Sequence, residues 1–246
     1  MSVFKKVILW MLGILVVGFG VASMWFWFTP VGINNYVNKI TIRLALSSPQ
    51  TLTQIGIIDD TILDFHSGKL DDQTEAFEDL MLQRTREARA GLDRYGPQGL
   101  QGQELLTWKI TAWFLDDAIR QGEMKHSGYV VNQISGVTVN LPQFLTDGHV
   151  IKSPRSAERY LSRLKEFGRV LREAQVRVED DRAHGVVPPD FVIDKALIGM
   201  RAFIDGGAVK NPLVTTLPER LEKAGIPTGD RARIIAEATT LVQREV

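Results

Sequence analysis

Histidine side chains are the first candidates for metal or acid–base chemistry in this chain. The sequence has four of them: His66, His126, His149 and His184. None is followed by glutamate and no two lie three or four residues apart, so the H-E-x-x-H pattern of zinc peptidase helices is absent. His184 is expected to close a helix by interacting with its carbonyl end. His149 lies in a segment suited to line a cleft, and the alternative is a surface or hydrogen-bonded loop histidine.

Neither the aspartate pairs nor any nucleophile motif of this sequence indicates a catalytic residue. Aspartate doublets occur at 59–60, 71–72, 116–117 and 180–181. Neighbouring residues of a helix point about 100° apart, so a doublet does not aim two carboxylates at one atom; solvated faces and helix caps explain them. No Gly-x-Ser-x-Gly motif, phosphate-binding glycine loop or dinucleotide fingerprint is present. We therefore assign no catalytic residue, metal ligand or cofactor to this chain.

Composition narrows the possible partners. The 246 residues include 29 Lys plus Arg and 29 Asp plus Glu, which gives a formal net charge of zero. No cationic surface is expected to gather nucleic acid, and nucleic-acid binding is not predicted. The absence of cysteine excludes disulfides, thiolate zinc sites, a cysteine nucleophile and a lipid-bearing cysteine.

The N-terminal segment has the length and polarity of a membrane span. Residues 7–28 carry no charge, and a helix of that length crosses the hydrocarbon core of a bilayer. Lys5 and Lys6 precede it and the next cation is Lys39, so the positive-inside bias predicts a cytoplasmic N-terminus. We expect a single-pass inner-membrane anchor with the remaining chain in the periplasm. A cleavable signal peptide, ending near Val21-Ala22-Ser23, is the alternative, and a buried core helix is a third.

The remaining chain is predicted to be mainly α-helical. Residues 30–47 should form a juxtamembrane amphipathic helix, and residues 48–246 an irregular multi-helix domain. The longest apolar stripe follows Ser153-Pro154 and runs for six turns to His184-Gly185. Pro188-Pro189 opens the next helix, making a hairpin with a rigid elbow. The helix near 104–119 is apolar almost all round, which predicts a central position in a bundle.

Two other helical segments carry specific expectations. Asp72 and Glu75 have the spacing of a capping box for a helix that reaches about Gly91. The last helix, capped by Thr228, keeps its apolar stripe up to Val246 without a stop signal. That uninterrupted stripe predicts a helical domain truncated at its C-terminus, with an apolar face on residues 231–246 that promotes self-association unless a partner covers it.

The segment 129–149 is the least regular part of this helical sequence. Its β-branched residues alternate imperfectly and are interrupted by Asn132, Gln133 and Gly136, which predicts extended or looping chain over 129–139. A short helical turn is expected at Leu141–Leu145. The pattern Tyr129-x-x-Asn132-Gln133-x-x-Gly136, then Leu141-Pro-x-Phe-Leu and His149, resembles the bacterial family called domain of unknown function 885.

The resemblance continues on both sides of that segment and covers about residues 48–246. It includes Ser48-Pro49-x-x-Leu52 upstream, and Ser153-x-x-x-Ala157 and Gly185-Val-Val-Pro188-Pro189 downstream. It implies a longer parent protein, largely helical and similar to zinc-dependent peptidases, whose H-E-x-x-x-G-H-like zinc helix lies in a C-terminal half that this chain does not reach. Zinc is then expected for the parent, and this N-terminal portion is expected to be inactive alone.

The resemblance also implies candidate substrate-binding residues: Tyr129, Asn132, Gln133 and His149. The alternative for this segment is that its polar groups only satisfy the backbone of a buried crossing. A different class of function also remains open, a non-catalytic membrane-tethered module that binds a peptide or partner protein through Trp108–Trp113 or the Tyr129 segment. For Trp108 and Trp113 core packing is the competing explanation.

Overall fold

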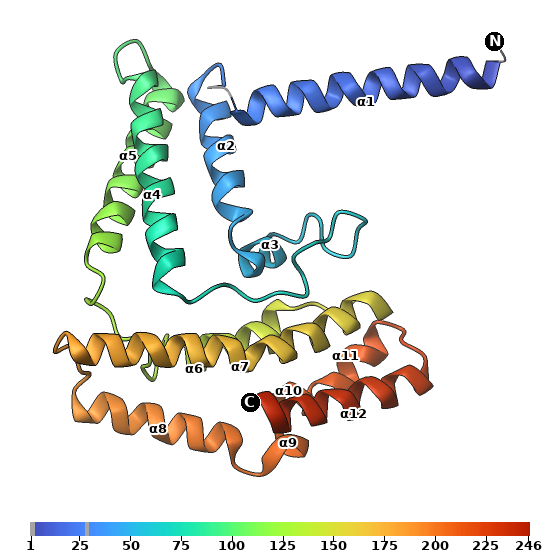
Figure 1. Ribbon diagram of the computed structural model, residues 1–246, viewed down its shortest axis with the longest axis vertical. Helices are drawn as coiled ribbons and strands as arrows, with labels where there is room; N and C mark the ends of the chain where they lie inside the picture. Colours follow the sequence, from blue (N-terminus) through green and yellow to red (C-terminus); the bar gives the residue numbers. More distant parts are fainter. Residues whose placement is uncertain (1–2, 28–29) are drawn as a thin grey trace. The chain divides into compact units, whose positions relative to one another are not determined.

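The described chain is helical, which confirms the mainly α-helical class expected from the sequence. The computed structural model describes residues 3–27 and 30–246, and these contain no β-strand (Figure 1). Internal contacts divide the chain into two compact units. Unit 1 comprises residues 1–44 and 81–121, and unit 2 comprises residues 45–80 and 122–246.

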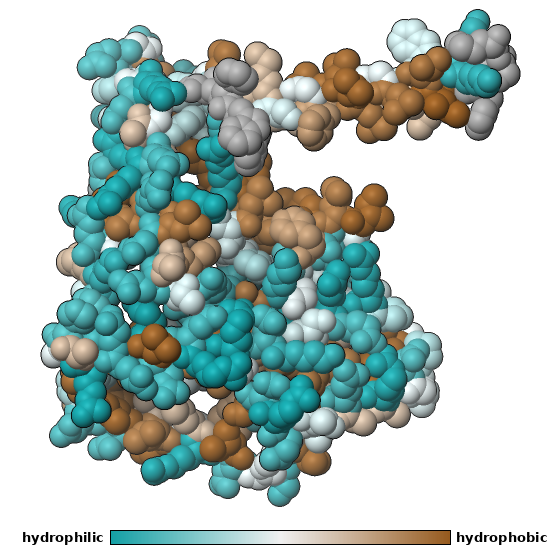
Figure 2. Space-filling view, in the orientation of Figure 1, coloured by the Kyte–Doolittle hydropathy of each residue, from teal (hydrophilic) through white to brown (hydrophobic). Residues whose placement is uncertain are grey.

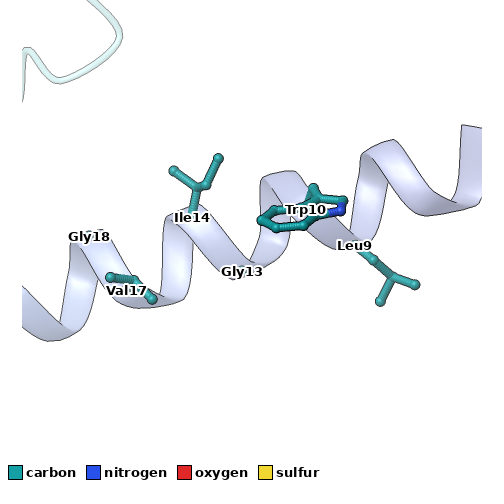
Figure 3. A pocket seen from close by; sticks show the side chains of 6 residues that line it. All are labelled: Leu9, Trp10, Gly13, Ile14, Val17 and Gly18. Atoms are coloured by element: carbon teal, nitrogen blue, oxygen red, sulfur yellow. The ribbon is translucent and has the colours of Figure 1, made fainter.

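Helix α1 (Val3–Trp27) of unit 1 is long and apolar enough, over Lys5–Met24, to cross a membrane or to act as a signal sequence. That stretch is not buried, and Figure 2 colours most of α1 as hydrophobic. Leu9, Trp10, Ile14 and Val17 project from it around Gly13 and Gly18, forming a shallow hollow on one helix (Figure 3). The expected end of the span includes Phe28 and Thr29, which lie outside the described residues. The side chains of Trp25 and Trp27 are also outside them.

The core of unit 1 lies between three helices: α2 (Ile33–Ala45), α4 (Glu75–Leu92) and α5 (Gly102–Glu123), with a 3₁₀ turn, η1 (Asp93–Tyr95), after α4. α2 is the amphipathic helix expected over 30–47. Its Ile33, Tyr36 and Ile40 share one face and pack with Leu92 and Leu115. The Tyr36 hydroxyl donates a hydrogen bond of 2.7 Å to the carbonyl of Ala88. The side chain thus ties α2 to α4.

Helix α5 is buried on one face only, so the prediction of a central helix apolar all round is wrong. Ala112 and Leu115 are buried in the core of unit 1 and Trp108 packs beside them, as core packing predicts. The opposite face carries large exposed apolar side chains at helical spacing: Leu106, Ile110, Trp113 and Phe114. The apolar residues of α5 therefore form two faces: one packs in the core of unit 1, and the other is exposed.

Unit 2 is built on the longest helix outside the membrane-type segment, α7 (Pro154–Ala183). It turns at an elbow into α8 (Asp190–Ile204), and Figure 1 shows these two helices running antiparallel. The remaining elements of this unit are short, apart from α12: α3 (Pro49–Ile55), α6 (Val137–Gln143), the π-helix η2 (Phe144–Gly148), α9 (Gly207–Lys210), α10 (Pro212–Thr215), α11 (Leu217–Lys223) and α12 (Thr228–Glu245).

The start of α7 follows from its sequence. The Ser153 side chain accepts a hydrogen bond from the amide of Ser156, the Ser156 side chain accepts one from the amide of Ser153, and Pro154 occupies the first turn. From there the apolar stripe buries Tyr160, Leu164 and other side chains in the main core of unit 2. A fully buried leucine contributes about 1.5–3 kcal/mol relative to an exposed one. α7 is therefore the frame of this unit.

Helix α12 packs against α7, and this overturns the expectation of an exposed apolar face on residues 231–246. Ile234, Ala238, Leu241 and Val242 are all buried in the α7 core. Gly168 allows the close approach, because a Cβ there would lie 2.7 Å from Oε2 of Glu245. A pattern that looked unpartnered along the sequence thus has its partner about 70 residues upstream in the chain.

Three local expectations are corrected. Asp72 does not cap α4; it accepts a hydrogen bond from the amide of Thr74, and the Thr74 hydroxyl accepts one from the amide of Phe77. Helix begins at Val137, so it includes the last three residues of the stretch expected to be extended, and it continues into η2 instead of stopping after one turn. Thr228 begins α12 without a side-chain capping hydrogen bond.

Candidate functional site

The loop that carries Tyr129 is shaped by Asn132. The side-chain carbonyl oxygen of Asn132 accepts hydrogen bonds from the backbone amides of Ile134 and Ser135, at 2.9 and 2.8 Å. Its side-chain NH₂ group donates to the backbone carbonyl of Tyr129 at 3.1 Å. Gly136 closes against it, because a Cβ there would lie 2.4 Å from the Asn132 backbone nitrogen. Asn132 therefore satisfies the backbone of the loop, which is the alternative that the sequence left open for it.

Tyr129 and Gln133 line two neighbouring hollows along one face of α8. The first hollow, of about 260 Å³, lies between Tyr129–Val131, the last turn of α7, the elbow and α8. The second, of about 330 Å³, lies between Gln133, α6, η2 and α8. Ala196 and Met200 of α8 line both hollows. We call the two together the α8 groove.

The first half of the α8 groove is largely apolar, whereas the second half also has polar lining residues: Gln133, Thr138, Gln143, Thr146 and Lys195. Val130, Val187, Ile193 and Leu197 contribute to its first half, with Asp181 and Arg182 at the edge. In the second half, the carbonyl oxygen of the Gln133 side chain is buried and has no hydrogen-bond partner among the described residues. A buried acceptor without a donor costs about 1–3 kcal/mol, so such atoms in a folded protein call for an explanation. A ligand that donates an N–H or O–H would supply one.

His149 lies apart from that groove. Its side chain is buried, with only 2% of the residue exposed, and it lines neither hollow. Nε2 donates to the carbonyl of Ser156 at 2.9 Å, and Nδ1 accepts from Nη1 of Arg163 at 2.5 Å. Both ring nitrogens are occupied in the neutral tautomer, so the structure gives His149 a packing position with no free group for a substrate.

Arg163 is the buried cation that organises this part of unit 2. Its guanidinium also donates to the carbonyl of Lys69 at 2.9 Å and to the hydroxyl of Thr53 at 2.6 Å. Burial lowers the pKa of Arg163 to about 10 against the opposing effect of nearby aspartates. Burial, together with the charge of Arg163, lowers the pKa of His149 to about 3. Chain segments far apart in the sequence are thus fixed to α7.

The site therefore brings together two of the four residues expected from the sequence, Tyr129 and Gln133. Sequence reasoning did not place Ala196 and Met200 in the groove, because both fit the apolar stripe of α8 equally well as core. A sequence signal that could have pointed to α8 is the Pro188-Pro189 elbow, because Tyr129, the elbow residue Pro188 and α8 residues line the same hollow. In the part of the chain that the structure describes, one group of side chains has donor atoms close enough together to hold a metal ion: His126, Asp180 and His184.

Comparison with solved structures identifies a similar fold. The chain superposes on a crystal structure described as "the putative lipoprotein from Colwellia psychrerythraea" with a TM-score of 0.65 and 15% sequence identity. The match covers 83% of this chain and 38% of that chain, so the present chain spans well under half of that protein. Identity at this level shows a shared fold only.

Comparison with sequences defines the family. No curated protein matches the chain. A family model described as "Bacterial protein of unknown function (DUF885)" matches residues 49–246, from the first residue of α3 to the end of α12. That match covers all of unit 2 after the first few residues, including the loop, the groove and the α7 frame. The chain belongs to the DUF885 family of bacterial proteins.

Proposed function

We propose that the chain is the exported, membrane-anchored N-terminal portion of a zinc-dependent peptidase-like protein, and that the α8 groove holds part of a peptide substrate. The carrying observation is that Gln133 lines a groove with mostly apolar walls and that its side-chain carbonyl oxygen is buried without a hydrogen-bond partner. Ligand sites typically combine such walls with a few polar groups that fix orientation. A peptide fits because its N–H groups are donors and its side chains fill apolar hollows.

The proposal assigns binding to this chain and catalysis elsewhere. A catalytic zinc needs a set of three protein ligands with an open position, usually including two histidines on one helix turn. The sequence holds no H-E-x-x-H segment, and His66 and His149 are buried inside unit 2. No hydrolytic step is therefore derived from its residues. The larger size of the structurally similar protein supports a parent that supplies the remaining half.

Export and anchoring rest on α1. Its composition fits a span, and Lys5 with Lys6 on its N-terminal side fits a cytoplasmic N-terminus. The proposal places the family-matched region in the periplasm, at the inner membrane. A peptide-binding groove there would meet peptides outside the cytoplasm.

Peptide binding is tested with the purified chain in detergent micelles and a fluorescein-labelled Gly-Leu-Gly-Leu amide as the probe. Fluorescence polarisation should show saturable binding, and Gln133→Leu should weaken it about five- to tenfold, the effect of one lost hydrogen bond. The same substitution removes an unpartnered buried acceptor, so the free energy of unfolding should stay equal or rise. A matched loss of stability and affinity would mean that Gln133 only supports the fold.

Two further measurements complete that test. Ala232→Trp, on the exposed side of α12, should leave probe affinity unchanged, whereas Met200→Trp should block the groove. The chain incubated with zinc should not hydrolyse the probe. Hydrolysis with one bound zinc ion per chain would overturn the assignment of catalysis to another part of the parent.

A second function, a non-catalytic tethered binding module, is favoured by the open apolar face of α5. Trp113 and Phe114 are more than half exposed there, together with Ile110. Exposed apolar faces of this kind commonly contact another protein. The binding assay separates the two cases: if serine at positions 113 and 114 abolishes probe binding and Gln133→Leu does not, the contact lies on α5.

A further inference from the structure

Two histidines and two aspartates converge at the C-terminal end of α7. His126 comes from the segment between α5 and α6, while Asp180, Asp181 and His184 belong to the end of α7. One donor atom from each of His126, Asp180 and His184 lies within 4.8 Å of the others. The rings of His126 and His184 stack, with centroids 4.2 Å apart and planes inclined by 16°. A segment 54 residues away in sequence thus brings its imidazole to the helix end.

The distances between these donors are close to those in a metal site. Nδ1 of His184 lies 3.4 Å from the Asp180 carboxylate, and Nδ1 of His126 lies 3.8 Å from it. Ligands at about 2.1 Å from a tetrahedral metal ion are separated from each other by about 3.4 Å. Asp181 approaches more closely, with its carboxylate 2.8 Å from Nδ1 of His126. The His184 donor therefore lies at ligand spacing from Asp180 and the His126 donor slightly farther away. The hydrogen bond between Asp181 and that same His126 nitrogen must be exchanged for the metal bond.

The electrostatic surroundings also favour a cation. The carbonyl end of a helix carries a partial negative charge, and the two carboxylates add full ones. The cations on neighbouring turns of α7 are Arg177, which forms an ion pair with Glu78, and the exposed Arg182. His184 is exposed and His126 is partly exposed, so an ion can reach the donors from solvent.

We propose that His126, Asp180 and His184, with Asp181 beside them, bind one divalent transition-metal ion of the Zn²⁺ type. Imidazole nitrogens with carboxylate oxygens suit Zn²⁺, Co²⁺, Ni²⁺ or Cu²⁺, whereas Mg²⁺ and Ca²⁺ prefer oxygen donors alone. On metal binding each neutral imidazole moves its proton from Nδ1 to Nε2 by exchange with solvent, which frees the Nδ1 lone pair for the ion. The hydrogen bond from Nδ1 of His184 to the carbonyl of Asp180, 2.9 Å long, is replaced by the metal bond.

The role assigned to this site is structural. Asp181 and Arg182 line the first half of the α8 groove, and His126 lies three residues before Tyr129. A metal ion bound there fastens the loop that forms one wall of the groove to the end of α7. The inference does not depend on the proposed peptidase function.

Metal binding is tested on the detergent-solubilised 246-residue chain after removal of any affinity tag and dialysis against a chelator. Titration calorimetry with Zn²⁺ should give one site per chain, and Co²⁺ should give visible absorption bands of a nitrogen–oxygen site. The absence of cysteine means that no thiolate charge-transfer band can arise from the chain. Zn²⁺ should also raise the melting temperature, because the ion binds the folded state.

His184→Gln and Asp180→Asn should each weaken Zn²⁺ binding at least about tenfold. The exposed position of His184 makes a folding failure of the first variant an implausible cause of any loss, and circular dichroism of the metal-free proteins checks this directly. Asp205→Asn, at an exposed carboxylate outside the cluster, is the matched control and should bind like the unaltered chain. Equal Zn²⁺ affinity in all four proteins, or no uptake by the unaltered chain, would show that the cluster is only a hydrogen-bonded helix end.

Discussion

At the scale of single residues, the buried pair of His149 and Arg163 makes the stability of unit 2 depend on pH. The folded protein holds His149 neutral with a pKa of about 3, whereas an unfolded histidine has a pKa near 6.5. Between these values the unfolded state binds the extra proton, so acidification favours unfolding. The stabilisation is complete above about pH 6.5 and is lost as the pH falls towards 3.

We expect His149→Gln to remove this component of the pH dependence. Glutamine keeps a donor and an acceptor near Ser156 and Arg163 but binds no proton. The unaltered chain should lose up to about 1.4 kcal/mol per pH unit from this one group below about pH 6, measured by urea unfolding in detergent. Burial raises the pKa of Asp64, but hydrogen bonds from Ser67 bring it down to about 2, so Asp64 acts below about pH 4 and the slope due to His149 is read between about pH 6 and pH 4. An unchanged slope in the variant would refute the assignment.

Residue identity also limited what could be predicted of the site. Tyr129 and Gln133 were proposed because they belong to the family-like pattern in a segment that is conspicuously irregular for a helical sequence. Asn132 belongs to the same pattern, but its side chain forms hydrogen bonds with the backbone of its own loop. His149 looked like a loop residue, since nothing local reveals that Arg163, fourteen residues later, turns towards it. Long-range partners of polar groups cannot be read from spacing.

At the scale of elements, helix–helix contacts depend on residues that the sequence marks only as helix ends. Gly91 was expected near the end of a helix, and it does lie in the last turn of α4. The structure adds the reason that no larger residue fits: a Cβ at Gly91 would lie 2.0 Å from the Tyr36 hydroxyl oxygen and 2.8 Å from its Cζ. The phenol of α2 thus rests on the bare backbone of α4.

Gly91→Ala should therefore destabilise unit 1 by about 1–3 kcal/mol, although alanine is the better helix former. Hydrogen exchange should show the loss in the amides of α2 and α4, and leave those of α7 unchanged. Tyr36→Phe removes the atom that the new methyl meets first, so it should cost less in the Gly91→Ala background than alone. If the two effects simply add, the close contact between Gly91 and Tyr36 is not the cause.

Periodicity predicted the elements far better than their pairing. The bounds of α7, the elbow and α8 follow from Ser153-Pro154, His184-Gly185 and Pro188-Pro189, each with a stereochemical reason. The apolar stripe of α12 was also predicted from the sequence, but its packing partner was not, because an apolar stripe does not identify the helix that covers it. The same ambiguity applied to α5, where one of two apolar faces is open.

At the scale of the whole molecule, α1 decides where the family-matched region works. An uncleaved anchor keeps the chain at the membrane, whereas cleavage near Val21-Ala22-Ser23 would release it. The segment has the same apolar character in both cases, and Figure 2 colours most of its visible face as hydrophobic. The chain contains no cysteine, so it offers no thiol for lipid attachment.

We predict that the chain expressed in a Gram-negative host remains in the membrane fraction after an alkaline carbonate wash and is released by detergent. Intact mass should match the 246-residue chain of 27.5 kDa. Replacing Gly13 and Val17 by arginine puts two charges in mid-span, each costing about 2.5–3.5 kcal/mol of insertion, and should shift the chain out of the membrane. Glutamate at Lys5 and Lys6 is the control that alters orientation signals without shortening the span. A soluble product lacking about 2.5 kDa from its N-terminus, the mass that cleavage near Val21-Ala22-Ser23 would remove, would establish a signal peptide instead.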